Sequence, residues 1–154
     1  MLRRSALANV TYGLELAGVP RAKRERRARE VLDAVGLTLV AGRPARVLSG
    51  GEQQKLALAR AWALEPEVLF LDEPTANLDP GATREVERIV DEIHASGTKI
   101  VMTTHNLGQA RRLADEILFM SGGRLADHAP VEQFFAEPST DEAAAFIKGE
   151  LPWS

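Results

Sequence analysis

Apolar residues in the first part of the chain recur at the spacing of amphipathic helices. Within residues 21–35, the positions at i, i+3, i+4 and i+7 spacing are Ala28, Val31, Leu32 and Val35. Gly36 ends this pattern, and breaks occur at Gly18-Val19-Pro20 and Gly42-Arg43-Pro44. The pattern therefore predicts a small, mostly helical lobe over residues 1–47.

A further helix is predicted to begin at Ser49. Ser49 and Glu52 form a Ser-x-x-Glu sequence, in which the serine hydroxyl and the glutamate carboxylate each accept a backbone N–H at the helix start. Apolar residues then recur at helical spacing until Pro66, which prevents continuation. The predicted helix therefore covers most of residues 49–65.

The second half of the chain alternates short apolar runs with helical patterns. Residues 68–71 are a continuous apolar run, which is typical of a parallel strand buried on both faces. A helix from Gly81 leads to a second strand over 99–104, and a helix over 107–114 leads to a third strand over 116–120. This alternation predicts an α/β fold with a parallel sheet.

The last part of the chain is predicted to leave this alternation. The sequence Ser121-Gly122-Gly123-Arg124 predicts a hairpin turn. From Pro130 onward the pattern is helical, and the residues expected to dock this tail are Phe134, Phe135, Phe146 and Ile147.

Composition narrows the class of protein. The chain has 154 residues, 45% of them hydrophobic and 27% charged, as in an ordinary globular domain. A net charge of −3 argues against a general nucleic-acid-binding surface, and the absence of cysteine excludes disulfides and thiolate metal sites. No run approaches the roughly 18 apolar residues that span a bilayer. We therefore expect a cytoplasmic protein and no nucleic-acid partner.

The basic run over residues 21–29 has two interpretations. It could form a patch for phosphate or acidic lipid, or it could be the solvated face of a helix. No aromatic residues interleave with the basic ones, which favours the solvated face.

Three ionisable residues follow predicted strands directly. Asp72 and Glu73 come after the first strand, and His105 follows the second. Ligands collect outside the carboxyl ends of parallel strands, where a carboxylate can hold Mg²⁺ through water and a second one can polarise an attacking water. These residues also have structural interpretations. Asp72 and Glu73 could simply form the turn that leads into Pro74, and His105 could be a hydrogen-bonded histidine at the end of a strand.

The order of these segments resembles the nucleotide-binding subunits of ABC transporters over nearly the whole chain. Leu48-Ser49-Gly50-Gly51-Glu52 is similar to the signature motif, and residues 68–72 resemble the Walker B strand. Glu73 resembles the catalytic glutamate, Ala76-Asn77-Leu78-Asp79 the D-loop, and His105 the switch histidine.

The resemblance implies a role for each matched residue. Ser49, Gly50, Gly51 and Glu52, with Asp79, would face ATP held by a second ABC ATPase subunit. Asp72 would order Mg²⁺ through water, and Glu73 and His105 would be catalytic. The implied cofactors are ATP and Mg²⁺. The implied partners are a second ATPase subunit, as a homodimer or heterodimer, and a transmembrane permease on the inner face of the membrane.

The sequence also departs from the family pattern. It contains no Gly-x-x-x-x-Gly-Lys-Ser/Thr loop, and no Gly-Lys dipeptide occurs at all. The resemblance begins just after the family's glutamine loop, so we expect the C-terminal portion of the domain. The predicted parts are residues 1–64 (helical subdomain and signature helix), 65–128 (Walker B, D-loop and switch-histidine core) and 129–154 (helical tail).

These features predict a chain that is inactive alone, because the P-loop supplies much of the positioning for phosphoryl transfer. The local sequence of residues 3–10 resembles that of family members that import oxyanions such as tungstate, molybdate or phosphate. Two alternatives stay open: a non-transport ABC ATPase of DNA repair or translation, and a non-catalytic fragment that occupies a dimer interface.

Overall fold

The computed structural model describes residues 3–150, which form two compact units. The described residues up to Thr103 make the first unit, and those from Thr104 make the second. Each unit has its own apolar core. The division into three parts at residues 64 and 128 stays a prediction.

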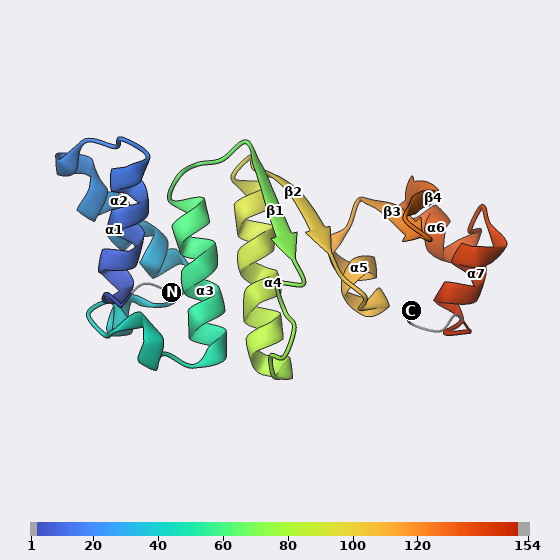
Figure 1. Cartoon of the computed structure of the whole chain (residues 1–154), viewed down its shortest axis with the longest axis horizontal. Coiled ribbons are helices and arrows are strands. Elements are labelled where there is room, and N and C mark those ends of the chain that lie inside the picture. Colours follow the sequence, from blue (N-terminus) through green and yellow to red (C-terminus); the bar gives the residue numbers. More distant parts are fainter. Residues whose placement is uncertain (1–2, 151–154) are drawn as a thin grey trace. The chain divides into compact units, whose positions relative to one another are not determined.

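The first unit begins with the predicted helical lobe (Figure 1). Its elements are the helices α1 (Ala6–Leu16), α2 (Arg21–Ala34) and α3 (Gly50–Trp62), with the 3-10 turns η1 (Thr38–Val40) and η2 (Ala45–Val47). Gly36 has a φ of 70°, a left-handed conformation that glycine adopts without steric cost, and it follows the end of α2. The helical pattern predicted over residues 1–47 is confirmed for residues 3–47.

The basic residues of α2 are largely paired with acids. Arg24 contacts Glu15 at 2.8 Å and Arg29 contacts Glu25 at 2.7 Å, measured between nitrogen and oxygen. Arg27 also lies 3.3 Å from Glu65. These pairs agree with the interpretation of this run as a solvated helix face.

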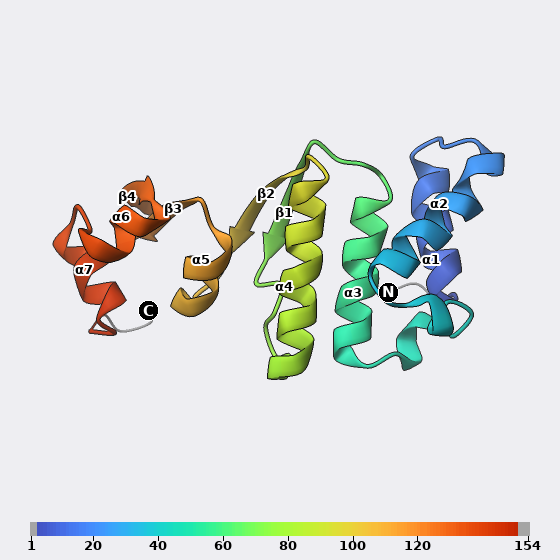
Figure 2. The ribbon, with the colours of Figure 1, turned by 180° about the vertical axis from the view of Figure 1, so that it is seen from behind.

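A short parallel sheet follows the lobe. Strands β1 (Val68–Asp72) and β2 (Lys99–Thr103) pair in register from Val68 opposite Lys99 to Asp72 opposite Thr103. Helix α4 (Pro80–Ala95) connects them and packs on one face of the pair, as Figures 1 and 2 show from opposite sides. The inward strand residues are Leu69, Leu71 and Ile100, which pack against the main core of the first unit.

The prediction that residues 68–71 are buried on both faces is wrong for this structure. Alternate residues of β1 point to opposite faces, and Phe70 is 75% exposed while Leu69 packs against the core. Val68 and Val101 are 43% and 41% exposed on the same side as Phe70. Within the described residues, only one face of this sheet is covered.

The second unit contains a hairpin and three short helices. Its elements are α5 (Leu107–Leu113), β3 (Glu116–Ser121), β4 (Arg124–Pro130), α6 (Val131–Ala136) and α7 (Asp141–Ile147). The predicted hairpin at residues 121–124 is confirmed, with both glycines at positive φ. The strand predicted over 116–120 is β3, and its described partner β4 runs antiparallel to it, as the hairpin requires.

Aromatic residues form the core of the second unit. The Phe119 ring centroid lies 6.0 Å from that of Phe134 and 5.0 Å from that of Phe146. Phe135 and Ile147 pack around this cluster, so the four predicted docking residues all contribute. Among residues 3–150, no helix is both long and apolar enough to cross a membrane.

Candidate functional site

The predicted capping box at Ser49 forms in full. The Ser49 hydroxyl oxygen accepts the Glu52 N–H at 3.2 Å, and a Glu52 carboxylate oxygen accepts the Ser49 N–H at 2.8 Å. The second of these bonds is the main cause that lowers the pKa of Glu52 below its ordinary value. Glu52 is therefore an ionised residue fixed at the positive end of α3.

The start of α4 carries a second cap. One Asp79 carboxylate oxygen accepts the N–H groups of Gly81 at 2.8 Å and Ala82 at 3.0 Å. These bonds, the one from Ala82 first, lower the pKa of Asp79 below its ordinary value. Asp79 is therefore held as a carboxylate at the N-terminus of α4.

The two helix starts lie against each other. A Cβ atom added to Gly51 would lie 2.9 Å from the Ala82 Cβ, closer than side chains normally approach. Gly50 has more room, since its nearest neighbour would be a Leu78 methyl at 3.9 Å. Glycine at 51 thus lets the signature and D-loop segments meet.

A small pocket of about 120 Å³ lies at this junction. It is lined from α3 and its cap by Ser49, Gly51, Glu52 and Lys55, and from α4 by Ala82 and Glu85. The structure therefore brings the signature residues and the D-loop helix together within the first unit.

The carboxyl ends of β1 and β2 form a second cluster in this unit. The Thr103 hydroxyl donates a hydrogen bond of 2.6 Å to an Asp72 carboxylate oxygen. The Glu73 N–H in turn lies 3.2 Å from both the carbonyl and the hydroxyl oxygen of Thr103. Glu73 has a φ of 44°, a left-handed conformation that is uncommon outside glycine. Thr103 therefore links the two predicted acidic residues.

Thr103 was not among the residues selected from the sequence. The pattern placed it inside the second strand and gave it no role in the site. The strand register places Thr103 directly opposite Asp72. Thr103 could have been selected from the sequence, because it is a hydroxyl-bearing residue near the end of the strand predicted to lie beside the one that ends at Asp72.

His105 belongs to the second unit. It is exposed and directly precedes Asn106, whose side chain accepts the Gln109 N–H at 3.0 Å and caps α5. The predicted meeting of His105 with Asp72 and Glu73 stays a prediction.

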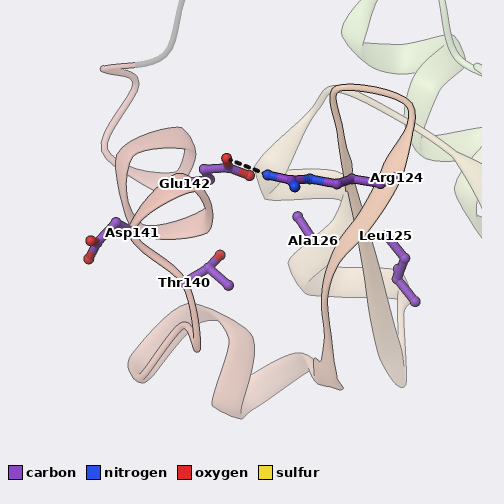
Figure 3. A pocket seen from close by; sticks show the side chains of 6 residues that line it. All are labelled: Arg124, Leu125, Ala126, Thr140, Asp141 and Glu142. Atoms are coloured by element: carbon purple, nitrogen blue, oxygen red, sulfur yellow. Dashed lines mark hydrogen bonds and ion pairs between the residues drawn. The ribbon is translucent and has the colours of Figure 1, made fainter.

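The second unit has a pocket of its own, between β4 and α7 (Figure 3). Arg124, Leu125 and Ala126 line it from the strand, and Thr140, Asp141 and Glu142 line it from the start of the helix. Arg124 and Glu142 form an ion pair of 3.2 Å across it. None of the predicted site residues lines this pocket.

The acidic cluster fits a magnesium ion only as a partial ligand set. Among residues 3–150, no group of three or more His, Cys, Asp or Glu side chains is arranged to hold a metal. Mg²⁺ commonly uses one or two carboxylates and completes its octahedron with phosphate oxygens and water. Asp72, one of whose carboxylate oxygens accepts a hydrogen bond from the Thr103 hydroxyl, is suited to supply one such carboxylate ligand.

Comparison with known proteins matches these observations. The family described as ABC transporter matches residues 3–76. A phosphate import ATP-binding protein, PstB 2 of Natronomonas pharaonis, is 41% identical over 93% of this chain and 54% of its own length. The glutamine transport ATP-binding protein GlnQ of Geobacillus stearothermophilus is 35% identical over 93% of this chain and 60% of its own.

A methionine import ATP-binding protein, MetN of Corynebacterium jeikeium, is 37% identical over 96% of this chain and 40% of its own length. The chain thus spans about half the length of these relatives. A solved chain described as a metal-chelate type ABC transporter, in an inward-facing conformation, superposes with a TM-score of 0.82 and 26% identity. That match covers 96% of this chain and 59% of the solved one. The chain therefore has the α/β fold of ABC transporter ATP-binding domains and is similar in sequence to about half the length of such proteins.

Proposed function

We propose that this chain is the signature-bearing part of an ATP-hydrolysing subunit that energises a membrane importer. The observation that carries the proposal is the junction of the α3 and α4 N-termini, where Gly51 and Ala82 are in close approach. Helix N-termini attract anions, because their first N–H groups lack intrahelical partners. The junction is thus suited to a polyphosphate.

The signature residues would bind nucleotide held by a second ABC ATPase subunit. The Ser49 hydroxyl oxygen accepts a bond from Glu52, so its own proton remains available to donate to a phosphate oxygen. Gly50 and Gly51 offer backbone N–H groups without side chains in the way. Glu52 keeps the serine oriented, and Asp79 fixes the start of α4 beside it.

The strand-end cluster would serve the hydrolytic step. Mg²⁺, when bound, neutralises charge on the phosphates. Asp72 would hold it through water, and Glu73 would orient the attacking water and accept its proton. Thr103 positions both residues through the bonds described above. His105 would contact the terminal phosphate.

The transported solute is proposed from the relatives. The three described above are named for import or transport of phosphate, glutamine and methionine. The phosphate import protein shares 41% identity with this chain, which supports an oxyanion, such as phosphate or tungstate, as the solute. The subunit would act at the inner membrane face together with a transmembrane permease.

Two measurements test the proposal. The 154-residue chain alone is expected to show no ATP turnover, and Mg²⁺-dependent turnover abolished by Glu73→Gln would overturn that expectation. When the chain is paired with a P-loop-bearing subunit, Ser49→Ala should reduce ATP turnover, because the signature would complete the partner's site. Glu73→Gln should not reduce it, because in that pair Asp72, Glu73 and His105 would face the second site, for which this chain supplies no P-loop.

Ser5→Ala is the matched control for the paired experiment. Ser5 caps α1 through a bond of 3.2 Å from the Ala8 N–H, the same length as the Ser49 cap. It lies outside the proposed nucleotide surface, so its loss should leave turnover unchanged. A larger effect of Glu73→Gln than of Ser49→Ala would reject the proposed arrangement.

A further inference from the structure

A short stretch of chain joins the two parts of the proposed site within the first unit. We call residues 63–67 the connector; they lead from Trp62, the last residue of α3, to Val68, the first residue of β1. Figures 1 and 2 show this stretch crossing from α3 to β1. The signature lies at the opposite end of α3, and Asp72 and Glu73 lie at the opposite end of β1. The connector therefore links the signature to the strand-end cluster along the chain.

Arg27 of α2 holds the start of the connector. Its guanidinium donates to the carbonyl oxygen of Trp62 at 3.2 Å and to that of Ala63 at 3.4 Å. Its Nη2 also lies 3.3 Å from a carboxylate oxygen of Glu65. The last carbonyl groups of a helix lack intrahelical partners, and a cation is favourable at that negative end. One arginine can serve all three groups, because its N–H donors are held in a rigid planar fork.

The backbone of the connector is strained at Glu65. Its φ is 51°, in the left-handed region that few residues other than glycine adopt. A residue keeps such a conformation only where the surrounding structure holds it there. The Glu65 N–H donates to the Trp62 carbonyl oxygen at 3.0 Å, and Arg27 pairs with the Glu65 side chain. Arg27 therefore stabilises the strained turn as well as the end of α3.

The turn between α4 and β2 fixes the other side of the connector. The hydroxyl of the buried Thr98 donates to the Pro66 carbonyl oxygen at 2.9 Å. The Trp62 indole N–H donates to the Ser96 hydroxyl oxygen at 3.2 Å. The end of α3 is thus held between α2 on one side and the α4–β2 turn on the other.

We propose, on the basis of the nucleotide role proposed above for the signature, that Arg27 is a positioning residue for that signature. Helix α3 has 13 residues and is about 20 Å long, so Arg27 holds the end that lies far from the nucleotide surface. Arg27 acts through α3 and does not touch the nucleotide.

The contact near the start of α3 explains how its far end matters. Gly51 and Ala82 are in close approach there, so α3 would tilt about this point if its far end moved. A tilt would turn the Ser49 hydroxyl and the first N–H groups of α3 away from a phosphate held by the second subunit. Hydrogen bonds weaken steeply as their angle departs from linear, so a change of direction is enough to weaken binding.

The test uses the 154-residue chain paired with a P-loop-bearing subunit and isolated through an affinity tag on this chain. Arg27→Met removes the charge and the donors and keeps a long side chain. It should raise the KM for ATP about fivefold or more and change kcat less, because contacts of the signature with bound ATP would weaken. A variant that was only less stable would lower the number of active pairs, and hence the apparent kcat, without raising KM.

Arg24→Met is the matched control on the same helix. The Arg24 side chain is 23% exposed, against 26% for Arg27, and it donates to the Val19 carbonyl oxygen at 2.6 Å and pairs with Glu15 of α1. These contacts lead away from the connector. Arg24→Met should therefore change the KM for ATP by less than about twofold, within ordinary surface effects.

Two further variants separate positioning from stability. Arg27→Lys keeps the charge but not the planar fork, so the rise in KM should be about twofold, smaller than in Arg27→Met. Distant residues normally have additive effects. If Arg27 acts through the signature, Arg27→Met should raise KM by no more than about twofold in a Ser49→Ala background, where a signature contact is already lost.

The outcomes distinguish this inference from the proposed function. An unchanged KM in Arg27→Met, an equal rise in Arg24→Met, or full additivity with Ser49→Ala would overturn the inference and leave the proposed function standing. If Arg27→Met does not form the pair, an unchanged KM in Arg27→Lys overturns the inference instead. Unchanged turnover in Ser49→Ala alone would reject the proposed function, and the inference with it.

Discussion

The capping box at the start of α3 allows a structural role and a nucleotide role to be separated. Ser49→Ala removes the hydroxyl that accepts the Glu52 N–H, and it leaves that donor without its partner at the helix start. Loss of a serine N-cap typically costs about 0.5–2 kcal/mol. Helix α3 places Leu56, Leu58 and Ala59 in the core of the first unit, so the cost should appear in the unfolding of that unit.

Glu52→Gln perturbs the same box more gently. The glutamine oxygen can still accept the Ser49 N–H, so the geometry of the bond is preserved while the charge is removed. Loss of one negative charge at a helix N-terminus costs about 0.3–1 kcal/mol. We therefore expect Ser49→Ala to be the more destabilising of the two.

Urea unfolding followed by far-UV circular dichroism measures both changes, with Ser5→Ala as the matched cap in α1. Ser49→Ala and Ser5→Ala should lower the free energy of unfolding by similar amounts, near 1 kcal/mol. Only Ser49→Ala should also reduce turnover in the paired ATPase experiment. A loss of activity in both variants would show that the effect comes from stability, and the argument for phosphate binding by Ser49 would fail.

Three other predictions test the site. Gly51→Ala should destabilise the first unit by about 1–3 kcal/mol in urea unfolding, because its Cβ would lie 2.9 Å from that of Ala82. In the control Gly50→Ala, the added Cβ would lie 3.9 Å from the nearest Leu78 methyl carbon, so this variant should be at least about 1 kcal/mol less destabilising than Gly51→Ala. Equal destabilisation in the two variants would contradict the close approach at Gly51. Thr103→Val should remove the hydroxyl bond to Asp72 and cost about 0.5–1.5 kcal/mol, and an unchanged unfolding midpoint would argue against that bond. The pKa of Asp79 lies below its ordinary value of 3.8, so its stabilising effect is complete above that value and is lost as pH falls through the lower folded pKa. Asp79→Asn should therefore flatten the fall in melting temperature below about pH 4, near the ordinary aspartate pKa, and an unchanged pH profile would refute the cap.

Local patterns predicted the helices and strands well. The Ser-x-x-Glu sequence gave the start of α3 because the cap depends only on residues 49–52. The turn at residues 121–124 was equally local. Because a hairpin joins antiparallel strands, this turn also predicted the direction of β4 relative to β3.

Burial was harder to predict than secondary structure. The run at residues 68–71 is apolar at every position, and this pattern implies a cover on both faces. In the structure, Leu69 and Leu71 meet the core while Phe70 is exposed. An apolar residue at every position of a strand is typical of a strand covered on both faces, whereas β1 is covered on one face in the described residues. The difference between pattern and structure therefore concerns the cover over Phe70.

The same reasoning separates the parts of the site that this chain fixes from those that an assembly would complete. Asp72, Glu73 and Thr103 are held by the register of two strands and by hydrogen bonds among themselves. Their arrangement requires no cover over Phe70, although a cover there would exclude water and strengthen their electrostatic effect. A segment bound over Phe70 should therefore change the reactivity of the cluster without changing its hydrogen bonds.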